Sequence, residues 1–174
     1  MRPMAKPVDS YNVDARSYET LYREEQLDKL KAVLKIGWLL CERILDVGCG
    51  TGLLTKRLAK RADFVVGLDV SIGMIRHGGR KGKVNFVLGD ANCLPFRDEG
   101  FDCYASFTAF HHFNGTKAAK EATRVVRKRG HVIITLFRMV AQAQQEVLER
   151  EEGLKLLTKG DAGKDILLVF MRAR

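Results

Sequence analysis

Three glycines alternate in a short run, and this run is the first candidate for a ligand-binding feature. The run reads Gly48-Cys49-Gly50-Thr51-Gly52. Glycines accept positive φ and let a ligand approach the backbone without meeting a Cβ. A dinucleotide fingerprint would place its third glycine one position later, where this chain has Leu53. The spacing therefore weakens a nicotinamide interpretation, and the alternative is a tight strand-to-helix turn that holds no ligand.

Two aspartates follow the next two β-rich runs of the chain. Asp69 ends Val65-Val66-Gly67-Leu68-Asp69 and offers carboxylate acceptors to a pair of hydroxyls, such as those of a ribose. Asp90 lies in Gly89-Asp90-Ala91-Asn92, where a carboxylate can accept from an exocyclic amine while a backbone amide donates to a ring nitrogen. Asp69 as a simple helix N-cap is the alternative. Taken with the glycine run, the two acids predict a nucleoside site.

Adjacent histidines, His111 and His112, follow the fourth β-rich run. An imidazole has an unperturbed pKa of about 6.5, which suits a general base near neutral pH. The alternative is that one histidine packs against the following segment while the other is solvated. Neither has a metal-ligand partner at a recognisable spacing, and the four cysteines are scattered. We therefore predict no metal site and reduced thiols.

The elements that must position these residues alternate between β-rich and helical stretches. Such alternation implies right-handed crossovers and a mostly parallel sheet, with ligands beyond the carboxyl ends of the strands. The expected strands span 44–47, 64–68, 84–88, 101–107, 131–137, 155–157 and 166–171, and the expected helices span 21–34, 53–60, 72–77, 117–127 and 142–151.

These elements predict an α/β fold: a doubly wound, Rossmann-like sheet of about seven strands with helices on both faces. The sheet is expected to be mostly parallel and to close with an antiparallel hairpin whose turn covers 159–163. At 174 residues, one domain with one core is expected. Within 1–174 we expect a leading lid and helix at 1–40, a cofactor-binding core at 41–137, and a C-terminal helix with closing strands at 138–174.

The run from Ile44 to Gly52, with Asp46 before the glycines, closely resembles the class I S-adenosylmethionine-dependent methyltransferases, and the resemblance extends through Phe137. It implies S-adenosyl-L-methionine as cofactor and S-adenosyl-L-homocysteine as product. It also implies that the acid and glycines of the first motif hold the aminoacyl and sulfonium end. The predicted cofactor-binding residues are Asp46, Gly48, Cys49, Gly50, Gly52, Asp69, Val70, Met74, Asp90, Ala91 and Phe107.

Within that class, Ser71-Ile72-Gly73-Met74 and the stretch 101–113 resemble the broad branch that includes quinone-biosynthesis methyltransferases. The leading segment, with Tyr11, Tyr18 and Tyr22, resembles this branch's N-terminal lid. The fourth strand ends in Ser106-Phe107-Thr108-Ala109, without the Asn/Asp-Pro-Pro-Tyr signature of related enzymes and without an acid to ligate a metal. Metal-independent transfer is therefore expected, with His111 or His112 assisting the acceptor.

The charge of the chain bears on the acceptor. A net charge of +9 and a pI of 9.6 favour attraction to anions. Basic clusters close the crossover helices, however, and these lie at the sheet edge opposite the cofactor. Acids are expected near the cofactor mouth, where they suit a sulfonium cation better than a phosphate backbone. These acids are Asp46, Asp69, Asp90, Asp98 and Glu99.

We therefore predict a small-molecule acceptor, with an RNA or protein acceptor as the alternative. A non-catalytic S-adenosylmethionine-binding or scaffold protein is the alternative from another class. Only 138–153 separates the fifth strand from the closing pair, so the acceptor site is expected to be open unless the leading segment, a second copy or a partner subunit covers it. No apolar run reaches the ~18 residues of a membrane span, and we expect a cytoplasmic protein with no membrane partner.

Overall fold

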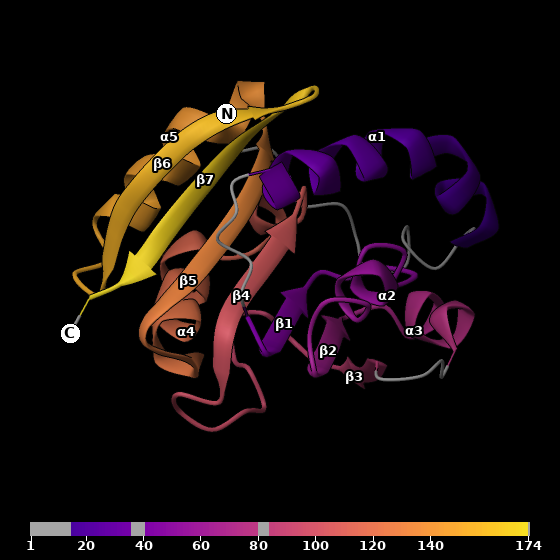
Figure 1. The fold of residues 1–174 in the computed structure, drawn as a ribbon, viewed down its shortest axis with the longest axis horizontal. Helices are drawn as coiled ribbons and strands as arrows, with labels where there is room; N and C mark the ends of the chain where they lie inside the picture. Colours follow the sequence, from indigo (N-terminus) through magenta and orange to yellow (C-terminus); the bar gives the residue numbers. More distant parts are fainter. Residues whose placement is uncertain (1–14, 36–40, 80–83, 174) are drawn as a thin grey trace.

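The computed structural model describes residues 15–35, 41–79 and 84–173. Its centre is a seven-stranded sheet of order β3-β2-β1-β4-β5-β7-β6 (Figure 1). Strands β1 to β5 run parallel, and β7 is antiparallel to both β5 and β6. The bounds are β1 Arg43–Val47, β2 Phe64–Asp69, β3 Val84–Leu88, β4 Phe101–Phe107, β5 Val126–Phe137, β6 Leu154–Ala162 and β7 Asp165–Arg172. The predicted fold class is confirmed.

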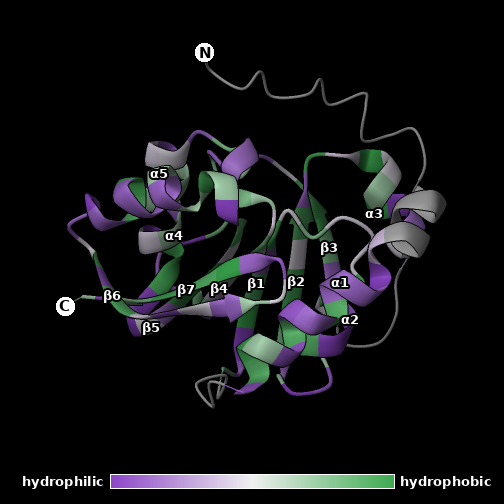
Figure 2. Cartoon of the chain, turned by 90° about the horizontal axis from the view of Figure 1, so that it is seen from above, coloured by the Kyte–Doolittle hydropathy of each residue, from purple (hydrophilic) through white to green (hydrophobic). Residues whose placement is uncertain are grey.

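Helices cover both faces of this sheet, as Figure 2 shows from above. On one face, α4 and α5 pack their buried residues into a core with β1, β4 and β5. On the other face, α1 and α2 contribute to a second core with the same strands. The bounds are α1 Ala15–Lys35, α2 Thr55–Leu58, α3 Ile72–Gly78, the short 3₁₀ helix η2 Phe110–His112, α4 Gly115–Val125 and α5 Arg138–Glu149.

Strand β1 shows how the two cores orient the chemistry. Leu45 and Val47 belong to the core under α4 and α5, whereas Ile44 belongs to the core under α1. Because side chains alternate across a strand, Asp46 lies on the same face as Ile44. Phe107 of β4 also belongs to the core on that face. The pleat thus turns Asp46 and Phe107 toward the side that α1 covers.

Several boundaries differ from the sequence prediction, and two of these differences change the sheet. Helix α4 ends at Val125, and the chain enters β5 at Val126, inside the segment expected to be helical. Pairing between β4 and β5 is irregular there, with Gly130 so close to Asp102 that a Cβ would lie 2.5 Å from its carbonyl oxygen. The closing hairpin is also tighter than expected, because β6 and β7 continue to Ala162 and Asp165. Two-residue turns suit the twist of antiparallel strands.

Cysteine pairing is a further correction. Cys41 and Cys103 form a disulfide with a Cα–Cα distance of 5.9 Å, which lies within the usual range for such bonds. The expectation of reduced thiols is therefore wrong for this pair, while Cys49 and Cys93 are free. The bond ties the residues just before β1 to strand β4. Among the described residues, no helix has the length and apolar character needed to cross a membrane.

Candidate cofactor site

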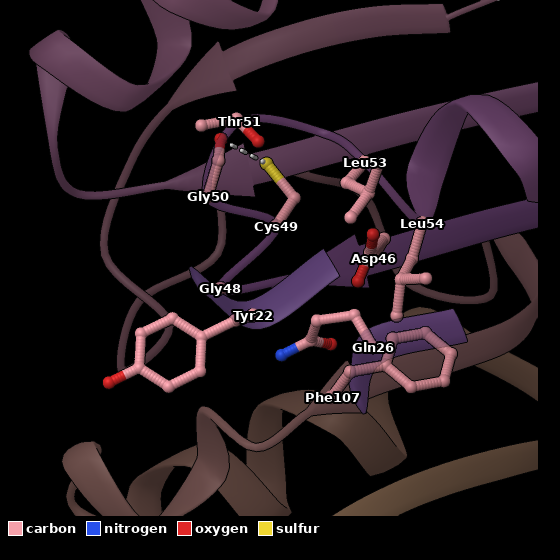
Figure 3. A pocket seen from close by; sticks show the side chains of 10 residues that line it. All are labelled: Tyr22, Gln26, Asp46, Gly48, Cys49, Gly50, Thr51, Leu53, Leu54 and Phe107. Atoms are coloured by element: carbon pink, nitrogen blue, oxygen red, sulfur yellow. Dashed lines mark hydrogen bonds between the residues drawn. The ribbon is translucent and has the colours of Figure 1, made fainter. Parts of the chain in front are cut away.

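A pocket lies beyond the carboxyl end of β1, where the strand order reverses between β1 and β4 (Figure 3). This is the place at which parallel α/β sheets hold their ligands. Several predicted residues line it, and four lining residues were not predicted: Gln26, Thr51, Leu53 and Leu54. The predicted residues that line the pocket are Tyr22, Asp46, Gly48, Cys49, Gly50 and Phe107.

The three glycines of the loop all have positive φ, at 76° for Gly48, 55° for Gly50 and 72° for Gly52. Their surroundings differ. A Cβ on Gly48 would lie 2.4 Å from the Cβ of Ala109, and one on Gly52 would lie 2.3 Å from the Phe86 ring. A Cβ on Gly50 would meet no atom within 4 Å. Gly48 and Gly52 are thus required by packing, while Gly50 leaves free space at which a ligand can approach the backbone.

Asp46 forms the buried wall of the pocket, with 1% of its surface exposed. Its Oδ2 accepts a 2.6 Å hydrogen bond from the Thr55 hydroxyl, and its Oδ1 has no hydrogen-bond partner. Burial and, to a smaller extent, the charge of Asp69 raise the pKa of Asp46 to about 7, against the opposing effect of the Thr55 hydrogen bond. A buried polar atom without a partner calls for one. The site is therefore suited to a ligand that brings a positive charge or an N–H donor.

Asp69 ends β2, next to the glycine loop. Its Oδ2 accepts from the Gly50 amide at 2.8 Å and its Oδ1 from the Ser71 amide at 2.9 Å. Burial raises the pKa of Asp69, while these amide bonds oppose the rise. Each carboxylate oxygen has a further acceptor site, so the side chain can still bind two hydroxyls. Asp69 does not line the pocket itself, but its bond to Gly50 places it at the border.

The remaining predicted contacts lie farther along the same edge of the sheet. Asp90 is exposed just after β3, and its Oδ1 accepts from the Asn92 amide and side chain, both at 2.8 Å. Val70 is half exposed beside Asp69. Met74, in α3, and Ala91, which follows Asp90, are both buried. The ends of β1, β2 and β3 therefore present their acids in strand order, and the adenine assignment of Asp90 stays a prediction.

The candidate catalytic histidines lie in η2, after β4, and neither lines the pocket. The two rings have centroids 4.0 Å apart, and His111 lies 5.3 Å from the Phe137 ring. His111 is half-buried and its Nδ1 has no hydrogen-bond partner. Burial, together with the nearby charges of His112 and Lys29, lowers the pKa of His111 to about 4. At neutral pH this imidazole is therefore an uncharged acceptor.

Of the three tyrosines predicted to form a lid, one is described at the pocket. Tyr22 lies on α1 and lines the pocket. Tyr18 also lies on α1, within a stretch whose side chains are not described, and Tyr11 lies outside the described residues. Gln26 follows Tyr22 by four residues and therefore shares its helix face. That spacing is the signal from which Gln26 could have been predicted.

Two acids expected at the mouth lie elsewhere. Asp98 pairs with Arg124 at the end of α4, and Glu99 pairs with Arg172 at the end of β7. Both partners border the amino-terminal part of β5, at the edge of the sheet opposite the pocket. The prediction fails because the loop after Asp90 returns across the sheet to begin β4. The acids near the mouth are thus Asp46, Asp69 and Asp90.

Comparison with known proteins bears on this site. Residues 45–134 match the model of a family described as a methyltransferase domain. A demethylmenaquinone methyltransferase of Corynebacterium kroppenstedtii is 37% identical over 97 residues, which cover 55% of this chain and 42% of the relative. The chain spans about half the length of the curated relatives it matches.

Solved structures share the fold over nearly the whole chain. A chain of the complex between the Haloferax volcanii Trm112 methyltransferase activator and a methyltransferase gives a TM-score of 0.78 at 14% identity, covering 99% of this chain and 100% of that one. The N-methyltransferase NodS of Bradyrhizobium japonicum, solved with S-adenosyl-L-homocysteine, gives a TM-score of 0.77 at 15% identity, covering 98% of each chain. At these identities the likeness concerns the fold.

Proposed function

Because this chain belongs to the methyltransferase domain family, we propose that it transfers the methyl group of S-adenosylmethionine to a small-molecule acceptor. The observation that carries the proposal is the unpartnered Oδ1 of Asp46 beside the open space at Gly50. A buried carboxylate in that state suits the positive charges of this cofactor, and a glycine without a neighbour leaves room for it. The resemblance of the sequence to class I enzymes and the family match support the same cofactor.

The cofactor supplies an electrophilic methyl group on a sulfonium, and the residues of this chain bind and orient it. Asp46 and the glycine loop hold the aminoacyl and sulfonium end. Asp69 binds the ribose hydroxyls while its bonds to Gly50 and Ser71 fix its orientation. Asp90 faces the adenine. Methyl transfer is an in-line displacement, so alignment of the acceptor within ~3–3.5 Å can supply most of the catalysis.

On the acceptor side, His111 is the proton acceptor in this proposal. Its Nδ1 is buried and unpartnered, and its pKa of about 4 keeps it uncharged at neutral pH. An uncharged imidazole can accept a hydrogen bond from an acceptor hydroxyl or amine and take its proton during transfer. No metal ion is required, since Ser106-Phe107-Thr108-Ala109 at the end of β4 contains no acid to ligate one.

A small molecule is proposed because the curated relative from Corynebacterium kroppenstedtii is named for one, demethylmenaquinone. An RNA or protein acceptor is the second candidate, favoured by the net charge of +9. A partner subunit is compatible with either, since the matching Haloferax volcanii complex contains a methyltransferase activator. A cytoplasmic location is part of the same proposal.

The test has two stages. Calorimetry with S-adenosylmethionine and S-adenosylhomocysteine comes first, and an absence of binding to both would overturn the methyltransferase proposal. Labelled cofactor is then incubated with the protein and with cell extract separated into metabolites, RNA and protein. Label in the metabolite fraction is expected. Label confined to RNA or protein would overturn the small-molecule acceptor, and binding without any transfer would favour the non-catalytic alternative.

A further inference from the structure

One face of α1 runs from the pocket to the end of β4 and the start of β7. Tyr22, Gln26 and Lys29 follow one another at spacings of four and three, so their side chains lie on one helix face. Tyr22 and Gln26 line the pocket, and Figure 3 shows Gln26 reaching into it between Tyr22 and Phe107. Gln26 is 8% exposed, and Asp46 is part of the same lining. The side-chain amide of Gln26 is thus held at the pocket wall by α1, a helix that precedes all strands of the sheet in the sequence.

Lys29 anchors that helix in a polar cluster whose charged centre, formed by Lys29 and Asp165, is buried. Its ammonium donates to the Thr108 hydroxyl at 2.6 Å and lies 3.2 Å from Asp165 and 2.8 Å from Glu25. The Thr108 hydroxyl in turn donates to Asp165 at 2.6 Å. The side chains of Lys29 and Asp165 have no exposed surface. Breaking a buried pair leaves an uncompensated charge, so the cluster fixes where α1 lies over the end of β4 and the start of β7.

From this geometry we propose that Gln26 is a cofactor-binding residue for the amino-acid end of S-adenosylmethionine and that Lys29 is the positioning residue that holds it there. The inference rests on the proposed function and names residues that the cofactor motif does not include. Lys29 acts through the helix, since its ammonium is occupied by Thr108, Asp165 and Glu25.

The position of Gln26 selects the amino-acid end. Asp69 ends β2 and Asp90 follows β3, so the nucleoside is expected to extend in that direction from the glycine loop. Gln26 and Phe107 lie on the other side, toward β4 and α1. The amino-acid end carries both an ammonium and a carboxylate. Asp46 suits the ammonium and would repel the carboxylate, whereas an amide N–H can donate to the carboxylate and its oxygen can accept from the ammonium.

Two ligands separate this contact from the rest of the site. S-adenosylhomocysteine carries the amino-acid end, and 5′-methylthioadenosine has the same nucleoside without it. Calorimetry on Gln26→Ala is expected to show S-adenosylhomocysteine binding weakened by roughly tenfold or more, the order for hydrogen bonds to charged groups. Binding of 5′-methylthioadenosine should be unchanged. Gln142→Ala, an exposed glutamine on α5, is the matched control and should alter neither affinity.

The positioning role of Lys29 is tested by a cycle. Lys29→Met should weaken S-adenosylhomocysteine binding, leave 5′-methylthioadenosine unchanged, and have no further effect in the Gln26→Ala background. Lys29→Arg, which keeps the charge, should restore part of the affinity. If Lys29→Met does not fold, Thr108→Ala is used in the same cycle, because it removes the hydroxyl between Lys29 and Asp165.

Each result bears on one of the two proposals. An equal loss for both ligands, or no loss in Gln26→Ala, would overturn the inference for Gln26. Additive effects in the cycle would overturn the positioning role of Lys29. A wild-type protein that binds 5′-methylthioadenosine but not S-adenosylhomocysteine would also overturn the inference. A wild-type protein that binds neither ligand would instead overturn the proposed function.

Discussion

The two sides of the site are built from different kinds of contact. On the side of the glycine loop, the loop and the acid at the next strand end meet through bonds such as that between Gly50 and Asp69. On the side that α1 covers, Lys29 of α1, Thr108 after β4 and Asp165 of β7 meet across large separations in the sequence. The glycine-loop side is formed largely by backbone groups, and it comes together because β1 and β2 are neighbours in the sheet. The second depends on where one helix comes to lie.

The largest expected effect concerns the disulfide beneath the site, which ties Cys41, just before β1, to Cys103 in β4. The bond closes a loop with a sequence separation of 62. Chain-entropy arguments assign such a loop about 4 kcal/mol of stabilisation. We expect denaturant unfolding to show a loss of that order when a reductant is present. Cys93→Ala, which removes an exposed free thiol, is the control, and equal unfolding with and without reductant would show that the bond does not contribute.

The same contrast explains what could be predicted from the sequence. The glycine loop and Asp69 were predicted because each is a local pattern at a strand end, and the sheet order brings strand ends together. Gln26 was missed because its role depends on where α1 packs. Asp98 and Glu99 were assigned to the wrong edge because the direction in which a loop returns leaves no trace in composition.

The cluster of Lys29, Thr108 and Asp165 could not be predicted from the sequence for a further reason. Lys29 reads as one more charge on an amphipathic helix, because nothing adjacent in the chain signals that its ammonium is buried. Its partners Thr108 and Asp165 come from the end of one strand and the start of another. Such a cluster is defined only when the sheet has closed, so its members have no shared spacing to detect.

A second prediction compares two glycines of the loop, Gly48 and Gly50. Gly48→Ala places a Cβ 2.4 Å from that of Ala109 and strains a φ of 76°, whereas Gly50→Ala strains a φ of 55° in open space. We expect Gly48→Ala to destabilise the fold by about 2–3 kcal/mol and Gly50→Ala by about 1 kcal/mol. Thermal unfolding measures the first effect. Calorimetry with S-adenosylhomocysteine should show the larger loss of affinity relative to stability in Gly50→Ala, and the reverse ranking would mean that Gly50 does not face the ligand.

A third prediction tests the assignment of Asp69 to the ribose hydroxyls. Asp69→Ala removes a carboxylate whose remaining acceptor sites are predicted to hold two hydroxyls. Affinity for S-adenosylhomocysteine is expected to fall by about 1.5–3 kcal/mol, the order for hydrogen bonds to a charged group. The loss should be as large for 5′-methylthioadenosine, which shares the ribose, and this distinguishes Asp69 from Gln26. Unchanged affinity for both ligands would show that the ribose lies elsewhere.

The last prediction concerns the protonation of Asp46, whose pKa is raised to about 7, chiefly by burial. In the free protein this carboxyl is mostly neutral below pH 7. Because its folded pKa lies above its unfolded value, its contribution to stability is fully present below the unfolded pKa and is lost as the pH rises through 7. Binding of a cationic ligand has the opposite sign, since the positive charge favours the ionised carboxylate.

Affinity for S-adenosylmethionine should therefore rise by about tenfold between pH 6 and pH 8, which corresponds to about 1.4 kcal/mol. Asp69 and Cys49 lie close to Asp46, and their ionisation is also suppressed by burial. Asp46→Asn retains both groups and removes the titrating carboxyl, so its affinity should vary little with pH. Calorimetry across this range on both proteins makes the comparison. A pH dependence that persists in Asp46→Asn would show that Asp46 is not the group whose titration controls binding.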